Sequence, residues 1–147
     1  MISLEYKVED AGWAVAIIGN GTEEKTITVS YLNDSLKQLA ESAIFINEQK
    51  AKRVVFMDEP GEHHLIVKTI SDNEVEYELR WYEDWTDWNA MEDEKSTIVL
   101  TGKTRKIRFV NEVRNILIGI MENIGTELYE KKWVNHEFPT EEYQKLV

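Results

Sequence analysis

The chain has 147 residues, 42% of them hydrophobic and 31% charged, and a formal net charge of −11 from 28 acidic and 17 basic residues. A chain of this size and composition is expected to fold as one domain, 1–147, and it lacks the low hydrophobicity that marks disorder. It contains no cysteine, which excludes disulfides, thiol nucleophiles and thiolate metal sites.

The acidic balance disfavours direct contact with nucleic acids and with anionic membranes, whose phosphates attract Lys and Arg. The first residues lack a basic stretch followed by an apolar one, so they do not indicate a signal peptide. No apolar run reaches the roughly 18 residues that a membrane helix needs. A cytoplasmic location is therefore expected.

The first third of the chain has the pattern of strands. Apolar and polar residues alternate over 2–8, an apolar run follows at 13–18, and a third strand is expected at 25–31. Glycines at Gly12 and Gly21 suit the turns between them. These features predict a three-stranded antiparallel meander.

A helix and three more strands follow. Leu36, Leu39, Ala40 and Ala43 share one helical face, and Asn33 or Asp34 can cap the helix start. Beyond it, the runs 53–57, 63–70 and 74–82 are separated by short turns and predict antiparallel hairpins. The last run alternates most regularly, which predicts one buried and one solvated face.

The final part is predicted to contain one more strand over 95–101 and a long helix over about 105–132. Gly119 and Gly125 weaken this helix, so a bend or a restart near Thr126 is expected. A short helical turn is expected from Pro139. The predicted fold class is α+β: one curved antiparallel sheet of six or seven strands, with the two main helices on one face.

The segment 59–64, Glu-Pro-Gly-Glu-His-His, holds the residues closest in type to a metal or acid–base site. Because neighbouring strand residues point to opposite faces, at most one of His63 and His64 can join a given site. A hairpin in which Pro60 and Gly61 form the turn and the acids are solvated is therefore the preferred interpretation. Neither metal ligands nor catalytic residues nor a cofactor are assigned, and no phosphate, dinucleotide or hydrolase-elbow motif occurs.

The most informative segment is 81–94, which combines three tryptophans with six acids and has no basic residue between Arg80 and Lys95. Aromatic residues are enriched at the centres of protein interfaces, and an acidic field speeds encounter with a basic partner. An alternative is that the tryptophans belong to the core and the acids form a solvated loop. The candidate partner-binding residues are Tyr82, Glu83, Asp84, Trp85, Asp87, Trp88, Glu92, Asp93 and Glu94.

The stretch 103–108, where the long helix is expected to begin, is basic and carries four Lys or Arg residues. It is expected to neutralise neighbouring acids and not to bind nucleic acid.

Several segments together resemble a family of small bacterial proteins, some similar to the immunity proteins of wall-associated polymorphic toxin systems. The residues that carry this resemblance are 29–36, 58–62, 129–133 and Phe138-Pro139. The resemblance implies a cytoplasmic protein that neutralises a cognate toxin domain, often a nuclease, and it implies no catalytic residue.

The sequence therefore predicts a non-catalytic, acidic protein-binding module with a basic protein partner, and an oligomeric state is not predicted. Two alternatives stay open. One is a small metal-dependent hydrolase that uses Glu59, Glu62 and either His63 or His64. The other is a small-ligand-binding protein with Trp85 and Trp88 lining a cavity.

Overall fold

A computed structural model describes residues 1–48, 50–83, 96–134 and 136–147. Seven strands and four helices occur in these residues. The elements are β1 (Ser3–Val8), β2 (Trp13–Gly19), β3 (Glu24–Ser30), α1 (Ser35–Ile44), β4 (Lys52–Met57), β5 (Glu62–Thr69), β6 (Glu74–Tyr82), β7 (Thr97–Arg105), α2 (Lys106–Asn123), α3 (Gly125–Trp133) and α4 (Thr140–Leu146).

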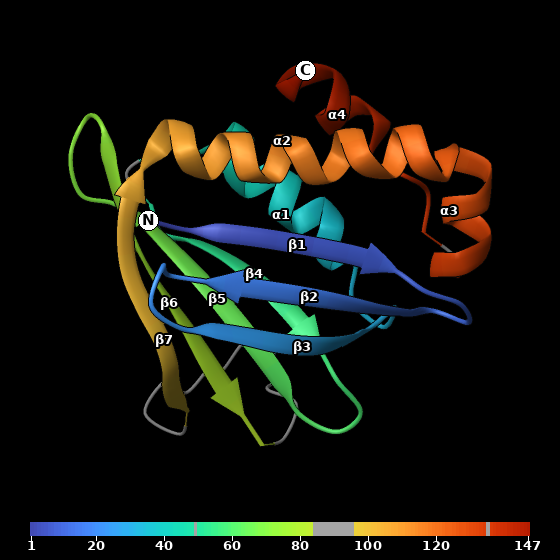
Figure 1. Cartoon of the computed structure of the whole chain (residues 1–147), viewed down its shortest axis with the longest axis horizontal. Coiled ribbons are helices and arrows are strands. Elements are labelled where there is room, and N and C mark those ends of the chain that lie inside the picture. The colour runs from blue at the N-terminus through green and yellow to red at the C-terminus, as the bar shows by residue number, and fades with distance from the viewer. Residues whose placement is uncertain (49, 84–95, 135) are drawn as a thin grey trace.

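The strands form two antiparallel sheets, each connected in chain order. The first sheet has the order β1-β2-β3, which confirms the predicted meander, and the second has the order β4-β5-β6-β7. The three hairpin strands predicted over 53–82 pair as expected. Figure 1 shows the three-stranded sheet in front of the four-stranded one, with the strands of the two sheets crossing at an angle.

The α+β class is thus confirmed, whereas the prediction of a single curved sheet is wrong. The helix α1 lies between β3 and β4 in the chain, and these two strands lie near each other without joining one ladder. On the outer edge of β4, the Asn33 side chain donates to the Val55 carbonyl and Gln38 accepts from the Val55 N–H. Side chains thus occupy backbone groups that a joining strand would use.

The helices begin and end close to the positions that the sequence indicates. The Asp34 carboxylate accepts from the Lys37 N–H at 3.5 Å, as expected of an N-cap. The predicted long helix is divided into α2 and α3 at Ile124, and Gly125 there adopts φ +76°, a conformation that glycine accepts without strain. The restart expected near Thr126 is confirmed by α3, and the short helical turn expected from Pro139 corresponds to α4.

The strand predicted over 95–101 runs instead over Thr97–Arg105, so it includes the first half of the basic stretch. Thr104 is buried, and its alternation with exposed Lys103 and Arg105 continues the strand up to α2. No helix of the described residues has the length and apolarity required to cross a membrane.

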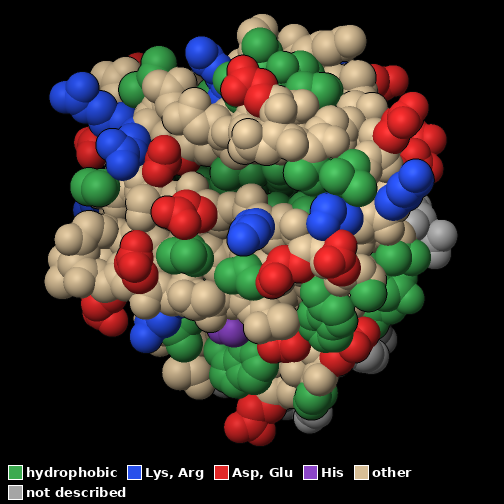
Figure 2. Space-filling view, turned by 45° about the vertical axis from the view of Figure 1, so that its right-hand side comes forward, with side chains coloured by type: hydrophobic (Ala, Val, Ile, Leu, Met, Phe, Trp, Pro, Cys, Tyr) green, Lys and Arg blue, Asp and Glu red, His purple; other side chains and the backbone are tan. Residues whose placement is uncertain are grey.

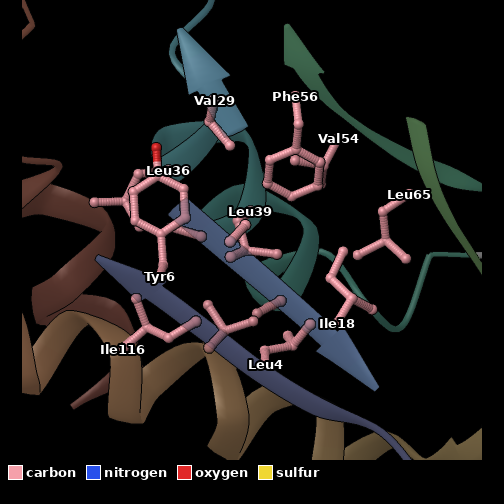
Figure 3. Packing of buried hydrophobic residues seen from close by; sticks show 14 of the residues in the cluster. Leu4, Tyr6, Ile18, Val29, Leu36, Leu39, Val54, Phe56, Leu65 and Ile116 are labelled. Atoms are coloured by element: carbon pink, nitrogen blue, oxygen red, sulfur yellow. The ribbon is translucent and has the colours of Figure 1, made fainter. Parts of the chain in front are cut away.

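One hydrophobic core lies between the sheets and helices. Figure 3 shows side chains of β1–β3, such as Leu4 and Ile18, facing Val54, Phe56 and Leu65 of the other sheet, with Leu36 and Leu39 of α1 among them.

The residues after α2 also belong to this core. Tyr129 and Trp133 are completely buried, and Phe138 packs edge-on against Tyr129 at 5.5 Å. The last 23 residues from Gly125 therefore complete the packing, and α2 lies lengthwise beside β1 (Figure 1).

Candidate functional site

The predicted partner-binding segment leaves the four-stranded sheet at the end of β6. Tyr82 is the last residue of β6 and Glu83 follows it. The neighbouring strand, β7, begins at Thr97. Trp81 and Thr97 are paired, so the described residues on either side of 84–95 lie at the same end of the sheet. The other predicted residues lie outside the described ones: Asp84, Trp85, Asp87, Trp88, Glu92, Asp93 and Glu94.

Tyr82 is anchored and Glu83 is exposed. Only 3% of Tyr82 is accessible to solvent, and its ring packs on the His64 ring with 4.2 Å between centroids. Its hydroxyl accepts a hydrogen bond from Arg53 Nη1 at 3.4 Å. Tyr82 thus has the environment of a supporting residue, and Glu83 is the first residue of the segment to face solvent.

These contacts belong to a polar cluster on the outer face of the four-stranded sheet, formed by Arg53, Glu62, His64 and Tyr82. Alternation along each strand places these four side chains on the face opposite the core residues Val54, Leu65 and Leu79. The register brings them together because Glu62 pairs with Tyr82 across β5 and β6.

His64 stands at the centre of the cluster. Arg53 Nη1 donates to His64 Nδ1 at 2.8 Å, and His64 Nε2 lies 2.5 Å from Glu62 Oε2. Because a guanidinium can only donate, Nδ1 must accept, and the imidazole proton is on Nε2 and is donated to Glu62. The neutral ring thereby links a cation to a carboxylate in a site where His64 has no solvent exposure.

Both His64 nitrogens are thus engaged by protein groups, so neither is open to a metal ion or a substrate in this arrangement. Among the described residues, no three His, Asp or Glu side chains are placed to hold a metal ion together. The cluster resembles a structural network more than a catalytic one.

The other residues of the predicted acid–base segment lie elsewhere. His63 points to the opposite face from His64, as predicted, and packs on Trp81 with 4.7 Å between ring centroids. Burial lowers the pKa of His63 from 6.5 to about 4, although nearby Asp58 acts in the opposite direction.

Glu59 accepts a hydrogen bond from the Ser30 hydroxyl at 3.2 Å, and His136 Nε2 donates to the Tyr31 carbonyl at 2.7 Å. Of the residues considered for a hydrolase, the structure joins only Glu62 and His64.

The sequence did not indicate that Arg53 and Tyr82 contact His64. The available signal was the i, i+2 spacing of Glu62 and His64 within one strand, which places both on one face. Identifying Arg53 and Tyr82 also needs the register of two hairpins.

Three acidic side chains lie at this end of the sheet. Asp58 and Glu59 lie in the turn between β4 and β5, beside the end of β6 where exposed Glu83 lies. The predicted basic stretch lies away from it. Arg108 Nε donates to the Ile2 carbonyl and Lys106 Nζ to Asn47, and Arg108 also pairs with Glu112 at 3.8 Å.

No protein-family model, curated protein or solved structure matches this chain. The fold and the contacts of the cluster therefore carry the functional interpretation without support from a relative.

Proposed function

We propose that this chain is a non-catalytic protein-binding module that engages a basic protein partner through the segment 82–94. In its most concrete form, the proposal is an immunity protein that neutralises a basic, nuclease-type toxin domain. A nuclease is basic where it holds phosphates, so an acidic protein can occupy that surface by charge complementarity.

The observation that carries the proposal is the arrangement at the end of β6. Tyr82 is fixed by Arg53 and His64, and exposed Glu83 follows directly, with Asp58 and Glu59 beside it. A fixed attachment reduces the conformational entropy that is lost when a neighbouring segment binds a partner. The acids of this end add to a chain of net charge −11, which favours attraction of a basic protein.

The hydrogen bonding of His64 favours binding over catalysis. A general base needs a nitrogen that can reach a substrate proton, whereas both nitrogens of His64 are held by Arg53 and Glu62 inside the protein. The small-ligand alternative depends on Trp85 and Trp88, which lie outside the described residues.

The test produces the proteins encoded by the neighbouring genes with and without this protein, and a basic toxin domain found among them is assayed for cell survival and binding kinetics. The key variant replaces Glu83, Asp84 and Asp87 by their amides. It should slow association and flatten its salt dependence, because exposed charges act within about 8–10 Å at physiological salt. The Trp85→Ala and Trp88→Ala variants should raise the dissociation rate and weaken binding by about 2 kcal/mol or more.

A matched control replaces the same number of exposed acids on α3 and in the residues after it, Glu130, Glu137 and Glu141, by glutamine. Equal slowing by both triple variants would show only an effect of net charge and would refute the assignment to 82–94. Survival that does not depend on the protein would refute the immunity function itself.

A further inference from the structure

The strand β1 is an edge strand, and alternate backbone groups along it point away from its sheet. Its ladder with β2 continues to Glu9, whose N–H donates to the Trp13 carbonyl at 2.8 Å, so the odd-numbered residues pair inward. The even-numbered residues then point outward, and the Leu4 N–H accordingly donates to Glu112 Oε1 of α2 at 3.1 Å.

The helix α2 covers only the first part of this edge. Arg108 donates to the Ile2 carbonyl and Glu112 accepts from the Leu4 N–H. Beyond Leu4, no described side chain accepts a hydrogen bond from the outward N–H groups of Tyr6 and Val8. The edge therefore changes from occupied to open along its length.

A groove of about 530 Å³ lies between the open part of β1 and α2. Figure 2 shows it as a hollow lined by hydrophobic side chains below the helix and bordered by Lys, Asp and Glu. Its apolar lining includes five residues that are each 7–9% exposed, Leu4, Tyr6, Val8, Ile116 and Ile120, together with partly buried Ile124.

Gly119 lies on the helical side of the groove. Because it has no side chain, a ligand in the groove can come close to the backbone of α2 at this position. A Cβ built on Gly119 would meet no heavy atom within 4 Å, and its φ is not among the positive values. Neither packing nor backbone geometry within the described residues thus calls for glycine, although glycine in a helix costs about 1 kcal/mol relative to alanine. The space that the missing side chain leaves belongs to the groove.

From these features we infer that the groove binds an extended peptide segment, apolar at alternate positions, which adds to β1 as a further strand. The outward N–H groups of Tyr6 and Val8 would donate to the peptide, and the carbonyls of Leu4 and Tyr6 would accept from it. One row of its side chains would enter the groove against Ile116 and Ile120.

The other row of peptide side chains would lie beside Glu5 and Lys7, which are exposed on the outer face of β1. This row is therefore expected to be polar, of either charge. At about 3.3 Å per residue, the stretch from Leu4 to Val8 accommodates a peptide of roughly five residues.

A separate peptide strand suits this groove better than a second copy of the chain. In a second copy, β1 carries its own α2 along the same edge, so two copies that pair through β1 would bring two helices into one narrow space. This site is also distinct from the end of β6, and its failure would leave the proposed function untouched.

The test begins with a random peptide library displayed on phage and selected against the folded protein. Selected peptides should have apolar residues at every second position. Bound to isotopically labelled protein, they should slow amide hydrogen exchange at Tyr6 and Val8 by about tenfold or more, with little change at Glu5 and Lys7, which the ladder already protects.

Two variants test the geometry by separate means. Gly119→Phe fills the groove from a position where a Cβ meets nothing, and it should abolish binding while the thermal melt is retained. Val8→Pro removes one outward N–H without removing a ladder hydrogen bond, which an edge strand tolerates, and it should weaken binding. The matched control is Arg114→Phe, which adds the same ring at an exposed position of α2 that does not line the groove.

Three results would overturn the inference. One is selection of peptides without the alternating pattern, and another is binding that Gly119→Phe leaves unchanged. The third is self-association in sedimentation experiments that Gly119→Phe abolishes, since it would assign the groove to a second copy of the chain.

Discussion

Replacing His64 by leucine tests whether the polar cluster stabilises the fold. Leucine keeps most of the buried volume but removes the hydrogen bonds with Arg53 and Glu62, at 2.8 and 2.5 Å. Each of these bonds has a charged partner and is worth about 1.5–3 kcal/mol, so both together are worth about 3–6 kcal/mol. Because apolar packing recovers part of this, we expect a loss of about 3–4 kcal/mol in the free energy of unfolding.

Urea denaturation measures this loss, provided that the slope of the transition is unchanged. A double-mutant cycle with Glu62→Gln should give a coupling free energy of about 1 kcal/mol or more, because the two side chains share one hydrogen bond. His63→Leu on the opposite face serves as a control that leaves the cluster intact. A loss below about 1 kcal/mol for His64→Leu, or a coupling near zero, would refute the reasoning.

Three further predictions concern the core, the groove and pH. Leu79→Ala should cost about 2–5 kcal/mol in urea denaturation, because Leu79 is fully buried between its strand partners Leu65 and Leu100; a loss below about 1 kcal/mol would contradict its facing. Gly119→Ala should raise the free energy of unfolding by up to about 1 kcal/mol, and a lower melting temperature would show that its Cβ meets an obstacle. Above pH 4, His63 stays neutral in the folded protein because its pKa is lowered from 6.5 to about 4. The contribution of the neutral ring to the free energy of unfolding is therefore complete above pH 6.5, and it is lost as the pH falls from 6.5 towards 4. The pH dependence of stability should therefore flatten over that range in His63→Gln, and an unchanged profile would contradict the pKa shift.

Local pattern was sufficient to predict most of the strands and helices. The alternation in 74–82 gave β6 with its buried face, because a period of two is set by the geometry of the strand itself. The interruption at Gly125 was also predictable, since the low helix propensity of glycine is a local property that does not depend on tertiary contacts.

The division into two sheets was not predictable in the same way. Periodicity tells which face of a strand is buried but not which strand lies beside it, and β3 and β4 are separated by α1. The extension of β7 into the basic stretch was missed because it depends on pairing with β6, where Glu76 lies opposite Lys103 and Glu74 opposite Arg105.

The candidate site shows the same limit. The opposite facing of His63 and His64 follows from their being neighbours in a strand, and it was predicted correctly. Arg53 enters the cluster from β4 and Tyr82 from β6, so their approach to His64 depends on the register of two hairpins. The segment that supplies the other predicted partner-binding residues, 84–95, lies outside the described part of the chain.

The attachment of β1 to α2 has a consequence for folding during synthesis. The Leu4 N–H reaches Glu112, 108 positions later in the chain, and β1 also contacts α3. Such long-range contacts raise the contact order and slow folding, because the intervening chain must close before they form. A ribosome that has released only β1, β2 and β3 has released a hairpin meander whose apolar face awaits both the second sheet and α2. During that interval the meander presents apolar side chains beside an open edge, so the nascent chain is most prone to aggregation before its last helices emerge.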